Sequence, residues 1–541
     1  MKILGYEFGF KKAEHISNKQ PSNAVYQDNL SWGHSYPIIN KKWDGEKTLG
    51  ELGNVVRNIP DFERLRLRSY DAYATIDTVK IIASKFFHWT IGTGLKLQSE
   101  PNTKVLKSEG INNTDEQYIE FQQLVEARFF VYANSKECDY KKEKVLGEIA
   151  LDGYQEEFLG GDCLVIIRYD DNGPNIQLVS GEHICDPSVD SEFYGYAEEK
   201  GNYVKHGIEV NSLGTQVAYY IKVKQLDGSI TTERIEAYGK KSKKRLAWML
   251  SGNKISQDHL RSVPAMSQSL EKINKLDRYT EAAVTKAEQA AKIVYAIEHQ
   301  EYSTGEGFLD QKARNIKNGT QSEPIDGNHA LADGLANRIT ETTSGQTFNM
   351  TQGSSLKSFG TEIETSFAEF HSTVFKSISA GVDVPSEVAM QEYNSNYSAS
   401  RAAINSFGYI IDVKRNKFAL NFYIPFYQHW LEWQILSNKI IAPGYIENID
   451  NFMVTKSYSQ CRFTGKNMPH IDPLKEAKAV ELMLALDLIS REQATENLGE
   501  GQWDENYKKK LEEDKLFPKD DISSSVTKVD TKSNTNTNGK N

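Results

Sequence analysis

The residue patterns that carry enzyme chemistry are missing from this sequence of 541 residues. No GxxxxGK motif followed by Ser or Thr is present, so no backbone loop with a lysine can hold nucleotide phosphates. HExxH and GxSxG are also missing, and the scattered carboxylates give no acid–base pair to nominate. His183 and Cys185 alternate on a predicted strand, but further metal ligands at suitable spacing are missing. We therefore expect no catalytic residue, no cofactor and no metal site.

Two other patterns could indicate a function, but neither is expected to carry one. Asn396-Tyr397-Ser398 matches a glycosylation acceptor by letter. Because the N-terminus predicts no secretory signal, this match is not expected to be used, and the triplet needs another explanation. The aromatic segment from Tyr423 to Trp433 could be a ligand platform, but its helical spacing favours core packing.

Composition and charge restrict the classes of protein to which this chain can belong. The formal net charge of -10 argues against a generic nucleic-acid binder, because affinity for a polyanion comes largely from Lys and Arg. Apolar stretches end well before the roughly 18 residues that a membrane helix needs, so we expect no membrane partner. The four cysteines lie far apart, which favours reduced thiols. The protein is expected to work where it is made.

The elements predicted for the first half are helices followed by strands, which indicates an α+β fold. Apolar spacing predicts a helix from Asn58 to His88, stopped by Gly92 and Gly94, and a second from Glu116 to Tyr132. The strand predictions are a hairpin of Cys163–Tyr169 and Asn175–Val179 around an Asp-Asp-Asn-Gly-Pro turn, and strands at Val217–Val223 and Ile230–Tyr238.

The second half is predicted to be mainly helical. One long helix is expected from Pro264 to Ile297, and a polar stretch from Gln300 to Ser358 is too long for a plain connection. Helical spacing resumes from Phe359 and ends near Gly381. A further helix from Ser398 should kink or break at Pro425, whose ring clashes with the Asn421 carbonyl and which lacks an N–H.

Shorter helices are expected near the C-terminus. Asp472 with Pro473 predicts one helix start, and Ser490 with Gln493 predicts a capping box. Beyond Pro518 the sequence lacks apolar content, so disorder is expected there.

Several stretches, taken in order, resemble the portal proteins of tailed bacteriophages, specifically the lambda-like portal family. The matching pieces are Arg64–Arg66, Ile91–Leu95, Gly160–Val165, Ile176–Val179, His206–Val210, Arg261–Pro264, Tyr393–Arg401, Pro425–Tyr427, Trp430 and Ile471–Pro473. Each is weak alone, and their common order over several hundred residues is specific. The most specific is the Asn-Tyr-Ser stretch, with Asn396, Tyr397, Ser398 and the Arg401 that closes it.

The resemblance implies a portal fold with a mixed α/β wing, a long-helix stem, a clip insertion, a kinked helix after a tunnel loop, and a small helical crown. The implied regions are an N-terminal arm (1–60), the wing (61–260), a stem helix (261–298), the clip (299–357), a second stem helix (358–383), the tunnel loop (384–397), a kinked helix returning to the wing (398–470), the crown (471–517) and a disordered tail (518–541). The Ala-rich strip around Ala287 would permit close packing between ring neighbours.

The resemblance also implies a function. A homo-oligomeric ring, usually of twelve subunits, would form the capsid-vertex channel through which double-stranded DNA is packaged and ejected. The terminase large subunit and the capsid, scaffold and head–tail adaptor proteins would dock on it. It would act in the virion, after assembly in the host cytoplasm.

An acidic or neutral channel wall would let DNA slide, whereas many lysines would hold it. The residues expected to line the channel are Glu387, Gln391, Glu392, Tyr393, Asn394, Asn396 and Tyr397.

Two alternatives remain at this level. Another head–tail adaptor or minor capsid protein would share the acidic composition without catalytic motifs, and ring size with a central hole would distinguish it. A hydrolase with dispersed site residues has only scattered His and Asp in its favour. It would not need two long helices around a polar insertion of this length.

Overall fold

The computed structural model describes residues 2–3, 6–7, 62–225, 227–254, 259–297, 346–349, 367–393, 397–466, 473–498 and 503–516. The chain divides into two compact units, Met1–Asn58 and Ile59–Asn541. In the first unit, β1 (Lys2–Ile3) and β2 (Tyr6–Glu7) pair antiparallel. The rest of the predicted arm, most of the predicted clip and the predicted tail lie outside the described residues.

The second unit begins with the helical segment that the sequence predicts. It consists of α1 (Phe62–Thr75), α2 (Asp77–Phe86) and the π-helical turn η2 (Phe87–Ile91), and it ends at Gly92 with φ 57°. The predicted second helix is α4 (Asp115–Ala133), which starts with a capping box. The other short helices of this part are α3 (Thr103–Ser108), η3 (Lys136–Cys138), α5 (Leu146–Gln155), η4 (Glu156–Gly160), η5 (Gly181–His183) and α6 (Tyr196–Glu199).

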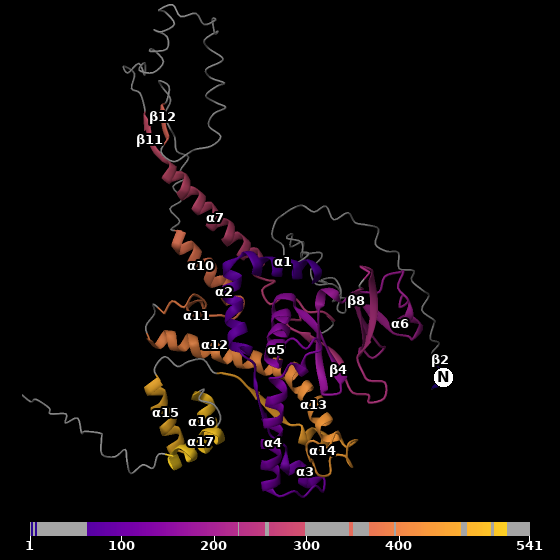
Figure 1. Ribbon diagram of the computed structural model, residues 1–541. Coiled ribbons are helices and arrows are strands. Elements are labelled where there is room, and N and C mark those ends of the chain that lie inside the picture. The colour runs from indigo at the N-terminus through magenta and orange to yellow at the C-terminus, as the bar shows by residue number, and fades with distance from the viewer. Residues whose placement is uncertain are drawn as a thin grey trace, which may run out of the picture. The chain divides into compact units, whose positions relative to one another are not determined.

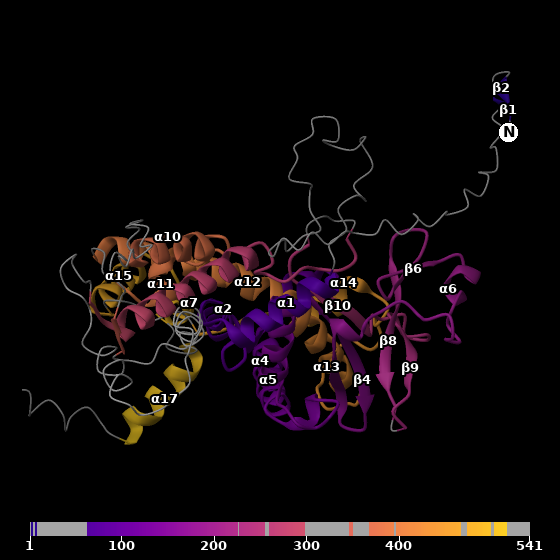
Figure 2. The same cartoon turned by 90° about the horizontal axis from the view of Figure 1, so that it is seen from above.

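Two antiparallel sheets face each other in this unit. The predicted hairpin is β4 (Asp162–Asp170) and β5 (Gly173–Ser180), with β10 (Ala247–Ser251) on the other side of β4. The second sheet orders its strands as β6 (Tyr203–Lys205), β7 (Ile208–Val210), β8 (Gln216–Lys224) and β9 (Ile230–Glu236). Figure 2 shows the sheets side by side, and Leu164, Ile166, Tyr219 and Ile221 belong to the apolar cluster shared by both.

A larger core joins the helices to the outer face of the hairpin. It includes a short sheet in which β3 (Lys96–Ser99) pairs antiparallel with β13 (Cys461–Thr464), so distant parts of the chain meet. Aromatic rings dominate this core: the ring of Phe129 lies 5.0 Å from that of Trp430, which is fully buried. The aromatic segment around Trp430 is therefore core packing, as expected.

Two helices pack side by side where the resemblance implies a stem (Figure 1). They are α7 (Leu270–Lys292) and α10 (Phe367–Ala380), and the ring of Tyr279 on α7 lies 4.4 Å from that of Phe370 on α10. The predicted helix from Pro264 to Ile297 is too long at both ends. Turns precede Leu270, and the β-branched run after Lys292 forms strand β11 (Ile293–Ile297), parallel to β12 (Gln346–Asn349).

The helix after the predicted tunnel loop changes from α-helical to π-helical geometry just before Pro425. It consists of α12 (Tyr397–Phe418), the π-helical turn η6 (Ala419–Tyr423) and α13 (Ile424–Leu436), and Figure 1 shows a change of direction between α12 and α13. Pro425 lies in the first turn of α13. The Asn421 carbonyl, which an amide at position 425 would reach in a regular helix, accepts a hydrogen bond of 2.7 Å from the Trp248 indole.

The remaining elements are helical. They are α14 (Phe452–Tyr458), α15 (Pro473–Ala485), α16 (Arg491–Leu498) and α17 (Trp503–Leu516). Ser490 and Gln493 form the predicted capping box, whereas Asp472 lies outside the described residues. No helix among the described residues is long and apolar enough to cross a membrane.

Candidate functional site

A fully buried carboxylate, Asp162, lies at the start of β4 between two buried arginines. Its Oδ1 accepts hydrogen bonds from Arg66 Nη2 at 2.6 Å and from Arg261 Nη2 at 2.7 Å. Its Oδ2 accepts from Arg261 Nε at 2.8 Å and from the Ser262 amide at 2.9 Å. Such pairs are retained only where the remaining polar atoms also find partners.

The arginines use their other N–H groups on backbone carbonyls. Arg66 Nε donates to Gly160 O at 3.0 Å, and Arg261 donates to the carbonyls of Gly181, Ile184 and His206. The centre therefore joins α1, the turn before β4, the loop between β5 and β6, the β6–β7 turn, and the segment that leads into α7. It fixes the base of the α7 helix to both sheets.

Close backbone approach at this centre explains two glycines. Gly161 has φ +92°, and a Cβ there would lie 2.5 Å from the Ser262 carbonyl oxygen. A Cβ on Gly181 would collide with the Arg66 guanidinium and with Asp162. A side chain at Gly161 would separate the loop before α7 from the start of β4, and one at Gly181 would displace Arg66 from Asp162.

The sequence did not predict this centre as a site, although its residues were noted. Arg66, Gly160 to Asp162, His206 and Arg261 all belong to the pieces that resemble the portal family. Another such residue, Glu209, is also buried and accepts a hydrogen bond of 2.8 Å from Arg234 Nε. The sequence shows charged residues beside glycines at these positions. It does not show which distant residues pair, because that depends on the folded structure.

The two arginines compensate the negative charge of Asp162. Burial alone would raise the pKa of Asp162, but Arg261 and Arg66 outweigh burial and hold this pKa below its usual range. Each carboxylate oxygen of Asp162 already accepts two hydrogen bonds from the protein, so neither is available to bind a ligand. The arrangement is suited to holding elements together and not to proton transfer.

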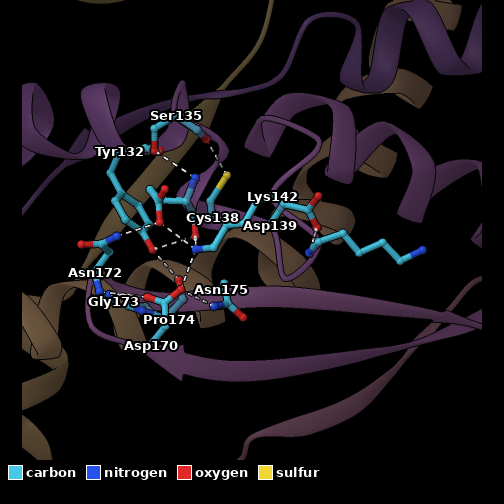
Figure 3. Close-up of polar contacts among 12 residues, drawn as sticks. Tyr132, Ser135, Cys138, Asp139, Lys142, Asp170, Asn172, Gly173, Pro174 and Asn175 are labelled. Atoms are coloured by element: carbon cyan, nitrogen blue, oxygen red, sulfur yellow. Dashed lines mark hydrogen bonds and ion pairs between the residues drawn. The ribbon is translucent and has the colours of Figure 1, made fainter.

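A second polar cluster fixes the turn of the β4–β5 hairpin to η3 (Figure 3). Lys142 Nζ donates to Glu137 Oε2 at 2.7 Å and to Asp170 Oδ2 at 2.5 Å. Asp170 Oδ1 accepts from the amides of Asn172 and Gly173, which closes the turn. The pKa of Glu137 lies below its usual value, mainly through the hydrogen bond from Lys142. The lysine ammonium thus occupies the position between these carboxylates.

The segment predicted to line a channel is partly helical. Helix α11 (Ser386–Met390) lies within it, and Val384, Val388 and Ala389 are buried in the main core. Glu387 is half-buried. The segment is therefore anchored on the body by its apolar side.

Directly after α11 the chain turns outward. Gln391 ends the helix in the left-handed region with φ 58°, and the Glu392 amide donates to the Glu387 carbonyl at 3.1 Å. Gln391, Glu392 and Tyr393 are all exposed, Tyr393 at 46%. The structure therefore presents an exposed, acidic turn between α11 and α12.

The other predicted residues continue from this turn. Asn394 and Asn396 lie outside the described residues, and Tyr397 is the first residue of α12. Ser398 is exposed, and Arg401 lies in the second turn of the same helix. Tyr397 and Ser398 of the Asn-Tyr-Ser stretch thus lie in the first turn of α12.

A buried carboxylate beside α12 was not predicted. Burial raises the pKa of Glu157 on η4 to about 7, against the opposing effect of Lys417 and Lys414. The Lys417 Nζ lies 3.9 Å from Glu157 Oε1 and donates to the Gly252 carbonyl at 2.7 Å. Glu157 and Lys417 thus link η4 to the C-terminal part of α12.

The fold is a mixed helical and sheet body with a pair of packed helices and no grouped metal ligands among the described residues. A family model described as phage portal protein, lambda family, matches residues 51–415. The chain belongs to this family of phage portal proteins. A search of curated proteins gave no match.

The structural comparison matched chains from gene transfer agent (GTA) particles. A chain in the virion of a native particle is 11% identical with a TM-score of 0.39, and the match covers 82% of this chain and 94% of that one. A neck chain of an empty particle, computed with C6 symmetry, is 12% identical with a TM-score of 0.38 and the same coverage. A neck chain of a native particle, computed with C12 symmetry, is 12% identical with a TM-score of 0.31, covering 76% and 97%.

Proposed function

We propose that copies of this chain close into a ring, with twelve expected, that forms the capsid-vertex channel for double-stranded DNA. The ring guides DNA during packaging and ejection, and the force comes from a separate terminase. The terminase large subunit docks on the clip at 299–357, and capsid, scaffold and head–tail adaptor proteins contact the ring. It acts in the virion, after assembly in the host cytoplasm.

The observation that carries this proposal is the exposed acidic turn at Gln391–Tyr393, held on the body by α11. A turn that is fixed at its base and exposed at its tip can contact a passing polymer without moving the helices on either side. From Val384 to Tyr397 the sequence has two Glu and no Lys or Arg. Such a surface does not release counterions from DNA, so it gives little grip. Amide and phenol groups add contacts to phosphates that carry no sequence information.

Two measurements test the proposal. Electron microscopy of the purified chain should show hollow discs, and solid or irregular particles under all assembly conditions would contradict the ring. Glu392→Lys, or deletion of residues 391–394, should leave ring assembly intact and impair DNA packaging or retention.

The control is Glu199→Lys, which makes the same charge change at an exposed position on α6. It should pack and retain DNA normally. If Glu392→Lys and the deletion also behave normally in assembled particles, the turn does not line the channel.

A further inference from the structure

A strongly basic turn joins β9 to β10 in a chain whose formal net charge is -10. Between positions 240 and 245 every residue except Ser242 is cationic: Lys240, Lys241, Lys243, Lys244 and Arg245. All five side chains are exposed except that of Lys244, which is half-buried. A short run of basic residues on a folded surface is typical of contact with a polyanion.

The backbone holds this turn in a defined shape. The Gly239 amide donates to the Lys244 carbonyl, and the Lys243 amide donates to the Gly239 carbonyl, each at 2.9 Å. Tyr238 and Arg245 form an antiparallel bridge directly below the turn. The tip is therefore presented by a closed hairpin.

The two cations at the end of the turn anchor it to the body. Lys244 pairs with Glu432 on α13. Arg245 Nη2 donates to Gln216 Oε1 at 3.3 Å and to the Tyr219 hydroxyl at 3.4 Å, both on β8. These contacts fix the turn to the second sheet and to α13.

The three lysines at the tip, Lys240, Lys241 and Lys243, point their charges to solvent. The Lys240 side chain is 82% exposed and its Nζ lies 3.8 Å from Glu236, and a pair so exposed contributes little. Lys241 and Lys243 are exposed and form no ion pair within the described part of the chain. The tip thus carries positive charge that the fold does not compensate.

A further lysine adds to the positive charge beside this turn. Lys456 on α14 donates to Gln428 Oε1 at 2.7 Å. Burial, together with the nearby charge of Lys244, lowers the pKa of Lys456. The two ammonium groups therefore lie close enough to repel each other, and an anion bound beside them would relieve this repulsion.

The chemistry of the tip fits duplex DNA better than an acidic protein. Protein interfaces are usually dominated by buried aromatic or apolar anchors, and positions 240–245 contain none. Exposed lysines alone are sufficient for DNA, because neutralising phosphates releases condensed counterions whatever the base sequence.

We propose that the tip lysines of the β9–β10 turn bind the phosphate backbone of double-stranded DNA. The inference deepens the proposed function and rests on it, because that function brings the chain into contact with DNA. It assigns a second contact, separate from the exposed acidic turn after α11. The acidic turn gives DNA little grip, whereas the basic turn holds it, so passage and retention depend on different parts of the chain.

Fluorescence anisotropy of the purified full chain with a labelled duplex of about 20 base pairs tests this contact. With about three phosphate contacts, the binding constant should fall about fortyfold between 50 and 200 mM salt. A triple variant, Lys240→Gln, Lys241→Gln and Lys243→Gln, should bind about tenfold or more weakly at 50 mM salt and lose most of the salt dependence.

Helix α17 supplies a matched control. Its three successive lysines are also exposed, but Glu512, Glu513 and Asp514 follow within about one helical turn and offset their charge. The control variant, Lys508→Gln, Lys509→Gln and Lys510→Gln, changes the net charge by the same amount and should bind the duplex normally. Circular dichroism melting shows whether both triple variants are folded.

Three outcomes would overturn the contact. Unchanged binding in the turn variant would exclude the tip lysines, and equal weakening in the two triple variants would mean that only net charge matters. Normal duplex binding by the turn variant, together with lost binding of labelled poly-glutamate, would assign the turn to an acidic protein surface.

Electron microscopy of the same preparations separates this inference from the proposed function. Hollow discs that bind no duplex at 50 mM salt would overturn the contact and leave the ring intact. A chain that forms no hollow discs would overturn the proposed function. In that case, duplex binding that is lost only in the turn variant would still support the contact.

Discussion

At the scale of single residues, Asp162 has the greatest consequence for stability. Asp162→Asn leaves Arg66 and Arg261 buried without a counter-charge, and breaking a buried pair in this way costs about 3–5 kcal/mol. Urea unfolding at pH 7 should show this loss. The control Lys107→Met removes the exposed pair with Asp115 and should cost less than about 1 kcal/mol. Equal losses in the two variants would mean that the centre is not a structural anchor.

The raised pKa of Glu157 predicts that the stability of the protein depends on pH. Its pKa is about 7 in the folded chain, against about 4.3 when unfolded, so the folded state binds the extra proton between these values. The free energy of unfolding should therefore fall as pH rises from about 4 to 7. Each unit over which only the folded state binds the proton changes it by about 1.4 kcal/mol.

The variant Glu157→Gln isolates this effect. It should match the unsubstituted chain near pH 4.5 and be more stable at pH 8 by about 1–3 kcal/mol, because a neutral amide replaces a buried charge. Chemical unfolding at several pH values measures the difference. A constant difference across that range would show that Glu157 does not titrate there.

At the scale of elements, the π-helical turn before Pro425 depends on Trp248. The Trp248 indole supplies the hydrogen bond that Pro425 cannot give to the Asn421 carbonyl. Trp248→Phe should cost about 0.5–1.5 kcal/mol, since it removes this hydrogen bond. In a Pro425→Ala background the cost should be smaller, because the new amide can reach that carbonyl. A double-mutant cycle measured by thermal unfolding gives the coupling, and a value near zero would contradict this account.

Local elements were predictable where neighbours in sequence determine them. The hairpin around Gly173, the capping box at Ser490 and the helix α4 follow from turn and cap residues. The strand Ile293–Ile297 was assigned to a helix, because its partner β12 lies more than forty residues away and contributes no local signal. For the same reason the β3–β13 pair and the arginines around Asp162 could not be paired from sequence. The channel-lining role of Gln391 and Glu392 stays a prediction. The buried side of α11 could not be predicted, because it depends on packing against distant parts of the core.

At the scale of the whole molecule, the net charge of -10 predicts that assembly depends on salt, because copies of like charge repel one another. The screening length falls from about 10 Å at 0.1 M to about 3 Å at 1 M salt, which weakens this repulsion. The concentration needed for ring formation should therefore fall with salt in analytical ultracentrifugation. Assembly that weakens with salt would indicate that attraction between opposite charges holds the copies together.

The pairing of β3 with β13 has a consequence for biosynthesis. The Leu95 amide donates to the hydroxyl of Tyr423, 328 residues further along, in the same core. The early helices of a nascent chain therefore cannot bury their apolar faces until almost the whole polypeptide has left the ribosome. Long-range closure of this kind slows folding and leaves apolar surface open to aggregation. Truncated translation products should consequently accumulate as chaperone clients or inclusion bodies, so only finished subunits would be competent to join an assembly.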